Sequence, residues 1–145
     1  MDYMKDLHES KYHLTVASRM YKSYSDFEEK RFLVGVINEL ARATSALIRS
    51  YLLFEGKGGK SSDKNLKIFM EKIGPKYMDK KTIINIFKTL EIEKAQKTSH
   101  IEFIRGNKII LLVEGKYKIL TSKRLSEFID SVKAGINRFP EKSIF

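Results

Sequence analysis

Apolar residues recur every three or four positions along most of the chain, a spacing that predicts a mainly α-helical protein. The clearest stripe runs from Leu33 through Leu40 and Leu47 to Phe54. Its helix is expected over residues 26–54, about 43 Å long at the α-helical rise. The approximate bounds of the five predicted helices are 2–24, 26–54, 63–73, 80–97 and 123–138. In the fourth helix the residues expected to face the core are Ile83, Ile84, Phe87 and Leu90.

Polar residues and glycines mark where these helices begin and end. Ser25-Asp26-Phe27-Glu28 has the pattern of a capping box and predicts the start of the second helix. Gly56 is expected to end that helix in a left-handed cap, and Gly74-Pro75 to end the third. The caps expected for the later helices are Ser62 or Asp63, then Asp79, then Thr121 or Ser122.

After the fourth helix the pattern changes to runs rich in β-branched residues. Gly106-Asn107 and Glu114-Gly115 separate the runs and are typical of two-residue hairpin turns. The three runs are 101–105, 108–113 and 116–120. We therefore expect a single domain over residues 1–145, an up-and-down helical bundle with a small three-stranded antiparallel β-meander inserted before the last helix.

Two-residue turns fix the pairing of the meander and divide its side chains between two faces. The expected pairs are 105/108, 103/110, 101/112, 112/117 and 110/119. The face expected to lie on the core carries Ile101, Phe103, Ile110, Leu112, Tyr117 and Ile119. The second face carries Ile104, Ile109, Leu111, Val113 and Leu120. A sheet that is apolar on both sides needs a cover on each, so the second face is covered either by the last helix or by another subunit.

The net charge of +10 is distributed unevenly. Residues 1–56 contain eight Lys/Arg and eight Asp/Glu, whereas residues 57–145 hold the remaining 20 basic and 10 acidic residues. Such an excess attracts RNA, another polyanion or an acidic protein. The alternative is that the lysines, 21 of the 28 basic residues, serve solubility.

The positive charge is densest just after the second helix, where residues 57–81 hold eight lysines and three acidic residues. Gly59-Lys60-Ser61 matches the end of a Walker loop, but Phe54 stands where the first glycine belongs and a helix precedes it. A flexible, basic loop is therefore expected rather than a nucleotide site. The candidate phosphate contacts are Lys57, Lys60, Lys64, Lys67, Lys80, Lys81, Arg105 and Lys108.

The chain lacks the residue patterns of common catalytic and metal sites. It has no cysteine, which excludes thiol chemistry and cysteine-ligated zinc. His8 and His13 are five residues apart, so a helix does not place them on one face. We expect no cofactor, no metal and no catalytic residue. No apolar run approaches the roughly 20 residues that span a bilayer, and the N-terminus has no signal core, so a cytoplasmic protein is expected.

The long helix pair and two further stretches resemble the HEPN superfamily of small helical bundles. The stretches are Asn38–Ile48 and Lys97–Ile110, the second followed by a helix over Leu125–Ile129. They are similar to small uncharacterised archaeal members over roughly residues 10–138. The resemblance implies an up-and-down bundle, frequent dimerisation, and links to RNA cleavage or to nucleotidyltransferase partners. Its nuclease members carry an arginine followed about four to six residues later by histidine, a pattern that this chain lacks.

Together these features predict a non-catalytic module that contacts RNA or another polyanion through its basic C-terminal part. The alternative is a protein-interaction or homodimerisation module that uses the second, apolar face of the meander.

Overall fold

The computed structural model describes residues 2–59, 61–98, 101–105 and 108–140, with the backbone alone for residue 30 and residues 101–105. The expectations for Lys60 and for the Gly106-Asn107 turn lie outside the described residues, as do those for the side chains of Ile101, Phe103, Ile104 and Arg105.

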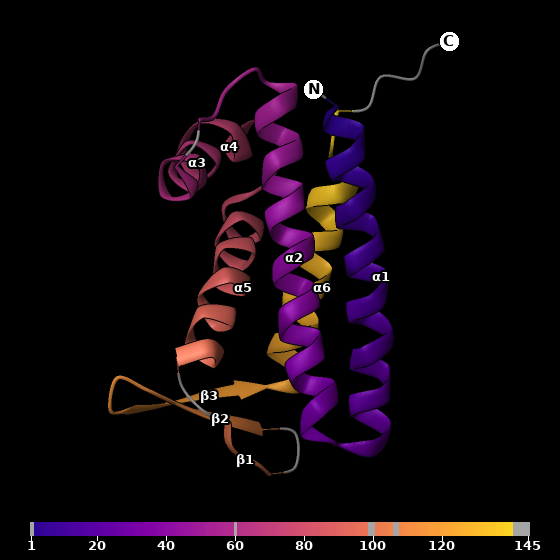
Figure 1. Ribbon diagram of the computed structural model, residues 1–145, viewed down its shortest axis with the longest axis vertical. Coiled ribbons are helices and arrows are strands. Elements are labelled where there is room, and N and C mark those ends of the chain that lie inside the picture. The colour runs from indigo at the N-terminus through magenta and orange to yellow at the C-terminus, as the bar shows by residue number, and fades with distance from the viewer. Residues whose placement is uncertain (1, 60, 99–100, 106–107, 141–145) are drawn as a thin grey trace.

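The described residues form a mainly α-helical fold of five helices with an antiparallel hairpin before the last one (Figure 1). The sequence predicted the mainly helical fold and placed a β-meander of three strands where this hairpin lies. The helices are α1 (Tyr3–Phe27), α2 (Lys30–Phe54), a third helix made of α3 (Ser62–Ile68), η1 (Phe69–Ile73) and α4 (Gly74–Tyr77), then α5 (Lys80–Thr98) and α6 (Ser122–Asn137). The strands are β1 (Ile101–Arg105), β2 (Lys108–Val113) and β3 (Lys116–Thr121).

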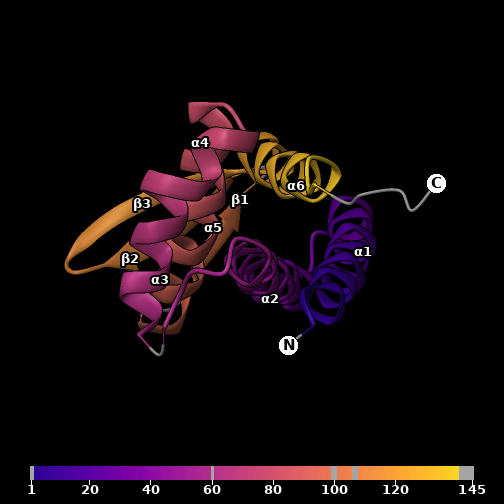
Figure 2. The same ribbon diagram turned by 90° about the horizontal axis from the view of Figure 1, so that it is seen from above.

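Helix α2 lies at the centre of the fold, in contact with α1, α5 and α6 (Figure 2). Its small residues allow neighbours to approach closely, since Ala43 and Ala46 are fully buried. At the crossing with α1, the Ser10 hydroxyl donates a 2.8 Å hydrogen bond to the Ala43 carbonyl. Buried apolar residues of α1, α2 and α6 belong to one core cluster.

The junction between α1 and α2 differs from the expected capping box. Helix α1 continues through Ser25 to Phe27, and Glu28 ends it with a left-handed φ of 53°. The Glu28 amide donates a 2.6 Å hydrogen bond to the carbonyl of Tyr24, whose side chain is buried. The prediction was wrong because burial of Tyr24 holds the last turn of α1 in the helix, and α2 begins after Glu29 without a side-chain cap.

Three other expected caps are confirmed. Gly56 has a φ of 64°, and the Gly56 and Lys57 amides bond back to the carbonyls of Leu53 and Leu52 in a Schellman arrangement. Asp79 accepts a 2.8 Å hydrogen bond from the Thr82 amide, and Thr121 accepts one of 3.1 Å from the Arg124 amide. The third helix is instead capped by Ser61, one residue before the expected position.

Gly74-Pro75 does not end the third helix, contrary to the sequence prediction. The Gly74 amide bonds to the Phe69 carbonyl five residues back, which makes a single π-helical stretch. Pro75 then lies in the first turn of α4, where its missing amide hydrogen breaks no helical bond. The helix therefore changes its hydrogen bonding at the proline and continues to Tyr77.

Helix α5 is rotated relative to its expected orientation. Its buried residues are Ile83, Asn85, Ile86 and Thr89, while Ile84 is exposed. The Thr89 hydroxyl lies 2.8 Å from that of Thr44, and the Asn85 amide donates a 3.0 Å hydrogen bond to Ser131. Because these polar groups are paired with α2 and α6, they can be buried, which apolar periodicity alone did not predict.

The backbone pairing of the hairpin follows the predicted register, with 110 opposite 119 and 112 opposite 117. Segment β1 runs antiparallel to β2 and pairs 105 with 108 and 103 with 110. The predicted pair 101/112 is wrong, because a register shift between Ile101 and Phe103 places Ile101 opposite Leu111.

The two faces of the hairpin are interchanged relative to the prediction. Ile109, Leu111 and Leu120 are at most 6% exposed and belong to the chain's own core, with Val113 packed against it. Helices α5 and α6 lie against β2 and β3 and supply this cover. Tyr117 and Ile119, expected in the core, are 66% and 63% exposed. Both faces are apolar, so the alternation of residues gave no basis for choosing between them.

The hydroxyl of Tyr51 provides a test of the core, because it is fully buried and donates a 2.6 Å hydrogen bond to the Gly135 carbonyl of α6. We expect Tyr51→Phe to lower the free energy of unfolding by about 1–2 kcal/mol, because it leaves that carbonyl unpaired. Urea denaturation measures the change. The matched control Tyr117→Phe removes an exposed hydroxyl and should have no effect, so equal losses in both variants would contradict the assignment.

The same side chain should make stability depend on pH. Burial raises the pKa of the Tyr51 hydroxyl well above its ordinary value near 10. Above about pH 10 the unfolded chain loses this proton and the folded chain keeps it, so the free energy of unfolding falls as the pH rises. The stability advantage of wild type over Tyr51→Phe should therefore stay constant up to about pH 9 and narrow as the pH rises above about 10. A constant difference would show that Tyr51 is not protected by the core.

Candidate functional site

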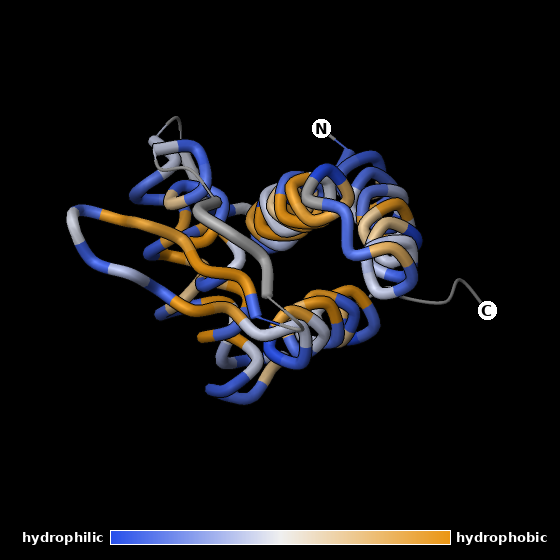
Figure 3. The backbone as a smooth tube through the Cα atoms, turned by 90° about the horizontal axis from the view of Figure 1, so that it is seen from below, coloured by the Kyte–Doolittle hydropathy of each residue, from blue (hydrophilic) through white to orange (hydrophobic). Residues whose placement is uncertain are grey.

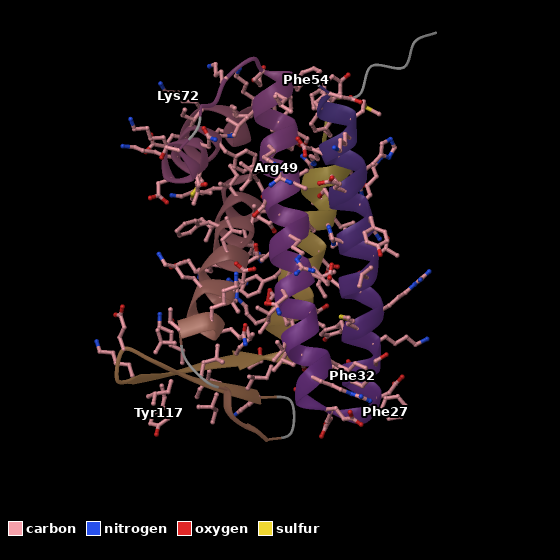
Figure 4. The ribbon with its side chains drawn as sticks, in the orientation of Figure 1. Phe27, Phe32, Arg49, Phe54, Lys72 and Tyr117 are labelled. Atoms are coloured by element: carbon pink, nitrogen blue, oxygen red, sulfur yellow. The ribbon has the colours of Figure 1, made fainter. Side chains whose placement is uncertain are left out.

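Seven described lysines between residues 57 and 81 are exposed. One of them, Lys76, is paired with Glu55, and we call the other six the lysine surface. They are Lys57, Lys64, Lys67, Lys72, Lys80 and Lys81. They lie on the loop after α2, on the third helix and at the start of α5, at the end of the bundle opposite the sheet (Figure 1). Figure 4 shows the Lys72 side chain directed away from the bundle. None of the six forms an ion pair with another described residue.

The loop that leads into the lysine surface is held in place by one side chain. The side-chain oxygen of Asn65 accepts a 2.8 Å hydrogen bond from the Gly59 amide, and its nitrogen donates a 2.8 Å bond to the Gly59 carbonyl. Gly58 has a φ of 106°, which favours glycine. The expected flexible connection is therefore clamped to α3, which fixes the position of the backbone beside Lys57.

Two acidic residues at the border of this surface are engaged with other groups. Glu55 accepts a 2.7 Å hydrogen bond from Lys76, and this contact raises the pKa of the Lys76 ammonium. Hydrogen bonds from Thr82 lower the pKa of the Asp79 carboxyl. Asp79 caps the N-terminus of α5, whose first two residues are Lys80 and Lys81. The cap therefore holds the backbone of these two lysines in the first turn of the helix.

The predicted phosphate contacts do not form one surface. Lys57, Lys64, Lys67, Lys80 and Lys81 belong to the lysine surface, whereas Lys108 is exposed on β2 at the far end of the molecule (Figure 1). Helix α5 extends the chain from one end of the bundle to the other and so separates Lys108 from the lysine surface. The role of Lys108 as a phosphate contact stays a prediction.

A polar cavity of about 170 Å³ lies between α1, α2 and α5, and sequence analysis did not predict it. Its lining residues are Glu9, His13, Ala41, Arg42, Ser45, Arg49 and Glu93. His13 Nδ1 lies 2.5 Å from Glu39 Oε2, and the second oxygen of Glu39 accepts a 3.0 Å bond from Arg42. From the sequence alone, the spacing of four residues between Glu9 and His13 places the two on one helix face.

The charged side chains of this cavity are already paired with one another. Arg49, labelled in Figure 4, donates to Asp6 at 3.3 Å and to Glu9 at 3.5 Å. Glu93 is paired with Lys97 at 3.6 Å. Each guanidinium therefore already has a carboxylate and is a poor site for phosphate, while the bonds between α1 and α2 hold the two helices together.

The described residues contain no group of three or more His, Cys, Asp or Glu side chains that could hold a metal ion. In the part of the chain that the structure covers, no helix combines the length and apolar character needed to cross a membrane.

Comparison with known protein families, with curated proteins and with solved structures finds no match to this chain. The resemblance to the HEPN superfamily therefore stays a prediction.

The capping role of Asp79 predicts a pH-dependent contribution to stability. Because hydrogen bonds from Thr82 lower its pKa in the folded chain, the stabilisation is present above about pH 4 and is lost as the pH falls through the folded pKa. Asp79→Asn keeps an acceptor but removes the charge, so its thermal midpoint should lie below that of wild type at neutral pH and approach it in acid. A gap that does not change with pH would contradict this role.

Proposed function

We propose that the chain is a non-catalytic module that binds RNA or another polyanion through the lysine surface, with Lys60 as a further contact. The observation that supports this most directly is six exposed lysines at one end of the fold without ion-pair partners among the described residues. Phosphate groups carry the negative charge with which such unpaired lysines can interact. The clamped loop keeps part of this surface ordered before binding, which reduces the entropy lost when a ligand binds.

The chemistry of the surface favours contact with a phosphate backbone over recognition of bases. The ammonium of lysine is a compact point charge on a flexible stem, suited to phosphate oxygens without a fixed geometry. Residues 57–81, which supply the lysine surface, contain no arginine, and their two aromatic side chains, Phe69 and Tyr77, are not exposed. Base edges are usually recognised by arginine or amide side chains, and bases stack on aromatic rings. Binding is therefore proposed to depend on charge and salt rather than on sequence.

The proposal includes two finer features of the fold. One is a HEPN-like, up-and-down arrangement of the helices, supported by the stretches that resemble that superfamily. The other is a sheet of three strands, with Ile101–Arg105 as the third, supported by the backbone pairing of 103 and 105 with β2. Arg105 and Lys108 would then form a separate basic position at the end of the sheet.

The structure argues against the alternative function, a protein-interaction or dimer surface on Ile109, Leu111 and Leu120. These side chains are buried in the chain's own core and cannot meet a partner without unfolding.

A triple variant of the lysine surface tests the proposal. We expect Lys64→Gln, Lys67→Gln and Lys72→Gln together to weaken binding of a single-stranded oligouridylate at low salt. The slope of log affinity against log salt should fall in magnitude by about 2, since each lost phosphate contact on a single strand contributes about 0.7. Fluorescence anisotropy of a labelled oligonucleotide over a salt series measures both quantities.

A matched control variant removes the same number of positive charges from another part of the protein surface. Lys22, Lys94 and Lys123 are exposed on α1, α5 and α6, toward the end of the bundle that carries the sheet. The control variant, with these three changed to Gln, should keep most of the affinity and slope. Equal losses in both triple variants would indicate a response to net charge alone. Absence of binding by wild type at about 50 mM salt would also contradict the proposal.

A further inference from the structure

The outer face of the hairpin is apolar and open to solvent. We call Ile110, Leu112, Tyr117 and Ile119 the hairpin face; Tyr117 and Ile119 are 66% and 63% exposed, and the other two are half-buried. They lie side by side, since Ile110 pairs with Ile119 and Leu112 with Tyr117. The hairpin extends away from the helices (Figure 3), and the Tyr117 side chain is directed outward from it (Figure 4). A clustered apolar face of this kind is typical of an interaction site.

Strand β3 also has a free backbone edge. In the described sheet its only strand neighbour is β2, so its other side has no strand partner. Four consecutive residues, 116 to 119, are exposed on both faces of the strand. A strand of this type offers backbone amides and carbonyls to an added strand, which is the basis of peptide recognition by β-augmentation.

The charges beside this edge indicate the composition of the occupant. Lys116 and Lys118 alternate with Tyr117 and Ile119, so they lie on the opposite side of the strand. Both are exposed, and neither forms an ion pair with another described residue. A strand placed alongside β3 would have one row of side chains beside Tyr117 and Ile119 and the other beside the two lysines.

We propose that the edge of β3 binds an extended protein segment in which apolar and acidic residues alternate. The apolar residues pack on the hairpin face, and the acidic residues pair with Lys116 and Lys118. This site is separate from the lysine surface and does not depend on it, because the two lie at opposite ends of the molecule (Figure 1).

Charge and side-chain chemistry favour this occupant over the two others that the surface admits. A second copy of this chain would bring its own lysines beside Lys116 and Lys118 and add a second net charge of +10. A single-stranded nucleic acid would need flat rings for its bases, whereas three of the four residues of the hairpin face are aliphatic.

The test uses a labelled synthetic octapeptide of alternating Val and Glu, and a second in which every Glu is replaced by Lys. We expect the Val/Glu peptide to bind wild type in fluorescence anisotropy and the Val/Lys peptide to bind at least about tenfold more weakly. The double variant Lys116→Glu with Lys118→Glu should reverse this preference, because it exchanges the charge beside β3 while leaving the hairpin face unchanged. A preference that does not reverse, or no binding of the Val/Glu peptide at millimolar concentration, would overturn the proposal.

A second pair of variants distinguishes binding at the hairpin face from nonspecific hydrophobic binding. Tyr117→Ser with Ile119→Ser should weaken binding of the Val/Glu peptide about tenfold or more. The control Tyr12→Ser with Ile84→Ser removes the same residue types from exposed positions on α1 and α5 and should leave it unchanged. Equal effects of the two pairs would overturn the proposal, and circular dichroism verifies that all variants fold.

A second copy of the chain or a nucleic acid bound at this edge would each give a different experimental result. Light scattering that gives a wild-type dimer, with a monomer for Tyr117→Ser with Ile119→Ser, would replace the proposal with a second copy of this chain. Loss of oligouridylate binding in that same variant, without any binding of the Val/Glu peptide, would replace it with a nucleic acid. Neither result would be produced by failure of the lysine surface, whose variants leave β3 intact.

Discussion

The burial of α2 is the constraint on which the rest of the structure depends. This helix contacts α1, α5, α6 and the third helix, and most of its side chains are removed from water. A helix covered on so many sides is stable only with its neighbours in place, because its apolar surface is larger than one partner can cover. Four of the five helices are therefore arranged around the remaining one, and the functional surfaces lie on what this packing leaves outside.

Buried polar contacts then determine how the neighbours are oriented. The pair Thr44 and Thr89 and the pair Asn85 and Ser131 link α5 to α2 and to α6. An unpaired polar group in the core is costly, so α5 is held in the rotation that satisfies these groups. Ile84 is exposed as a result. Helix α5 itself leads the chain from the lysine surface at one end of the bundle to the sheet at the other.

The surfaces at the two ends differ in what they offer a ligand. The lysine surface offers charge with little apolar area, whereas the edge of β3 offers backbone groups and an apolar face with lysines behind it. The first combination suits a phosphate backbone and the second an extended protein segment. If both proposals hold, the chain can join a polyanion to a protein without the two ligands competing for one site.

Local patterns predicted the elements of this fold better than the contacts between them. The apolar stripe of α2, the Gly56 cap and the register of the hairpin are short-range properties, and each is confirmed. Which face of the hairpin is buried depends on where α5 and α6 lie. Ile109 and Ile110 point to opposite faces and are equally apolar, so the sequence pattern alone does not show which face is covered. The clamp of Asn65 on Gly59 and the contact of His13 with Glu39 were missed because each joins residues whose approach depends on the folded chain.

Hydrogen–deuterium exchange of the chain with and without a single-stranded oligouridylate tests the central claim most directly. The proposed function predicts that the ligand slows amide exchange within residues 57–81 and leaves β2 and β3 unchanged, because the lysine surface and the hairpin lie at opposite ends of the fold. Slower exchange confined to β2 and β3, or no change anywhere at low salt, would contradict it.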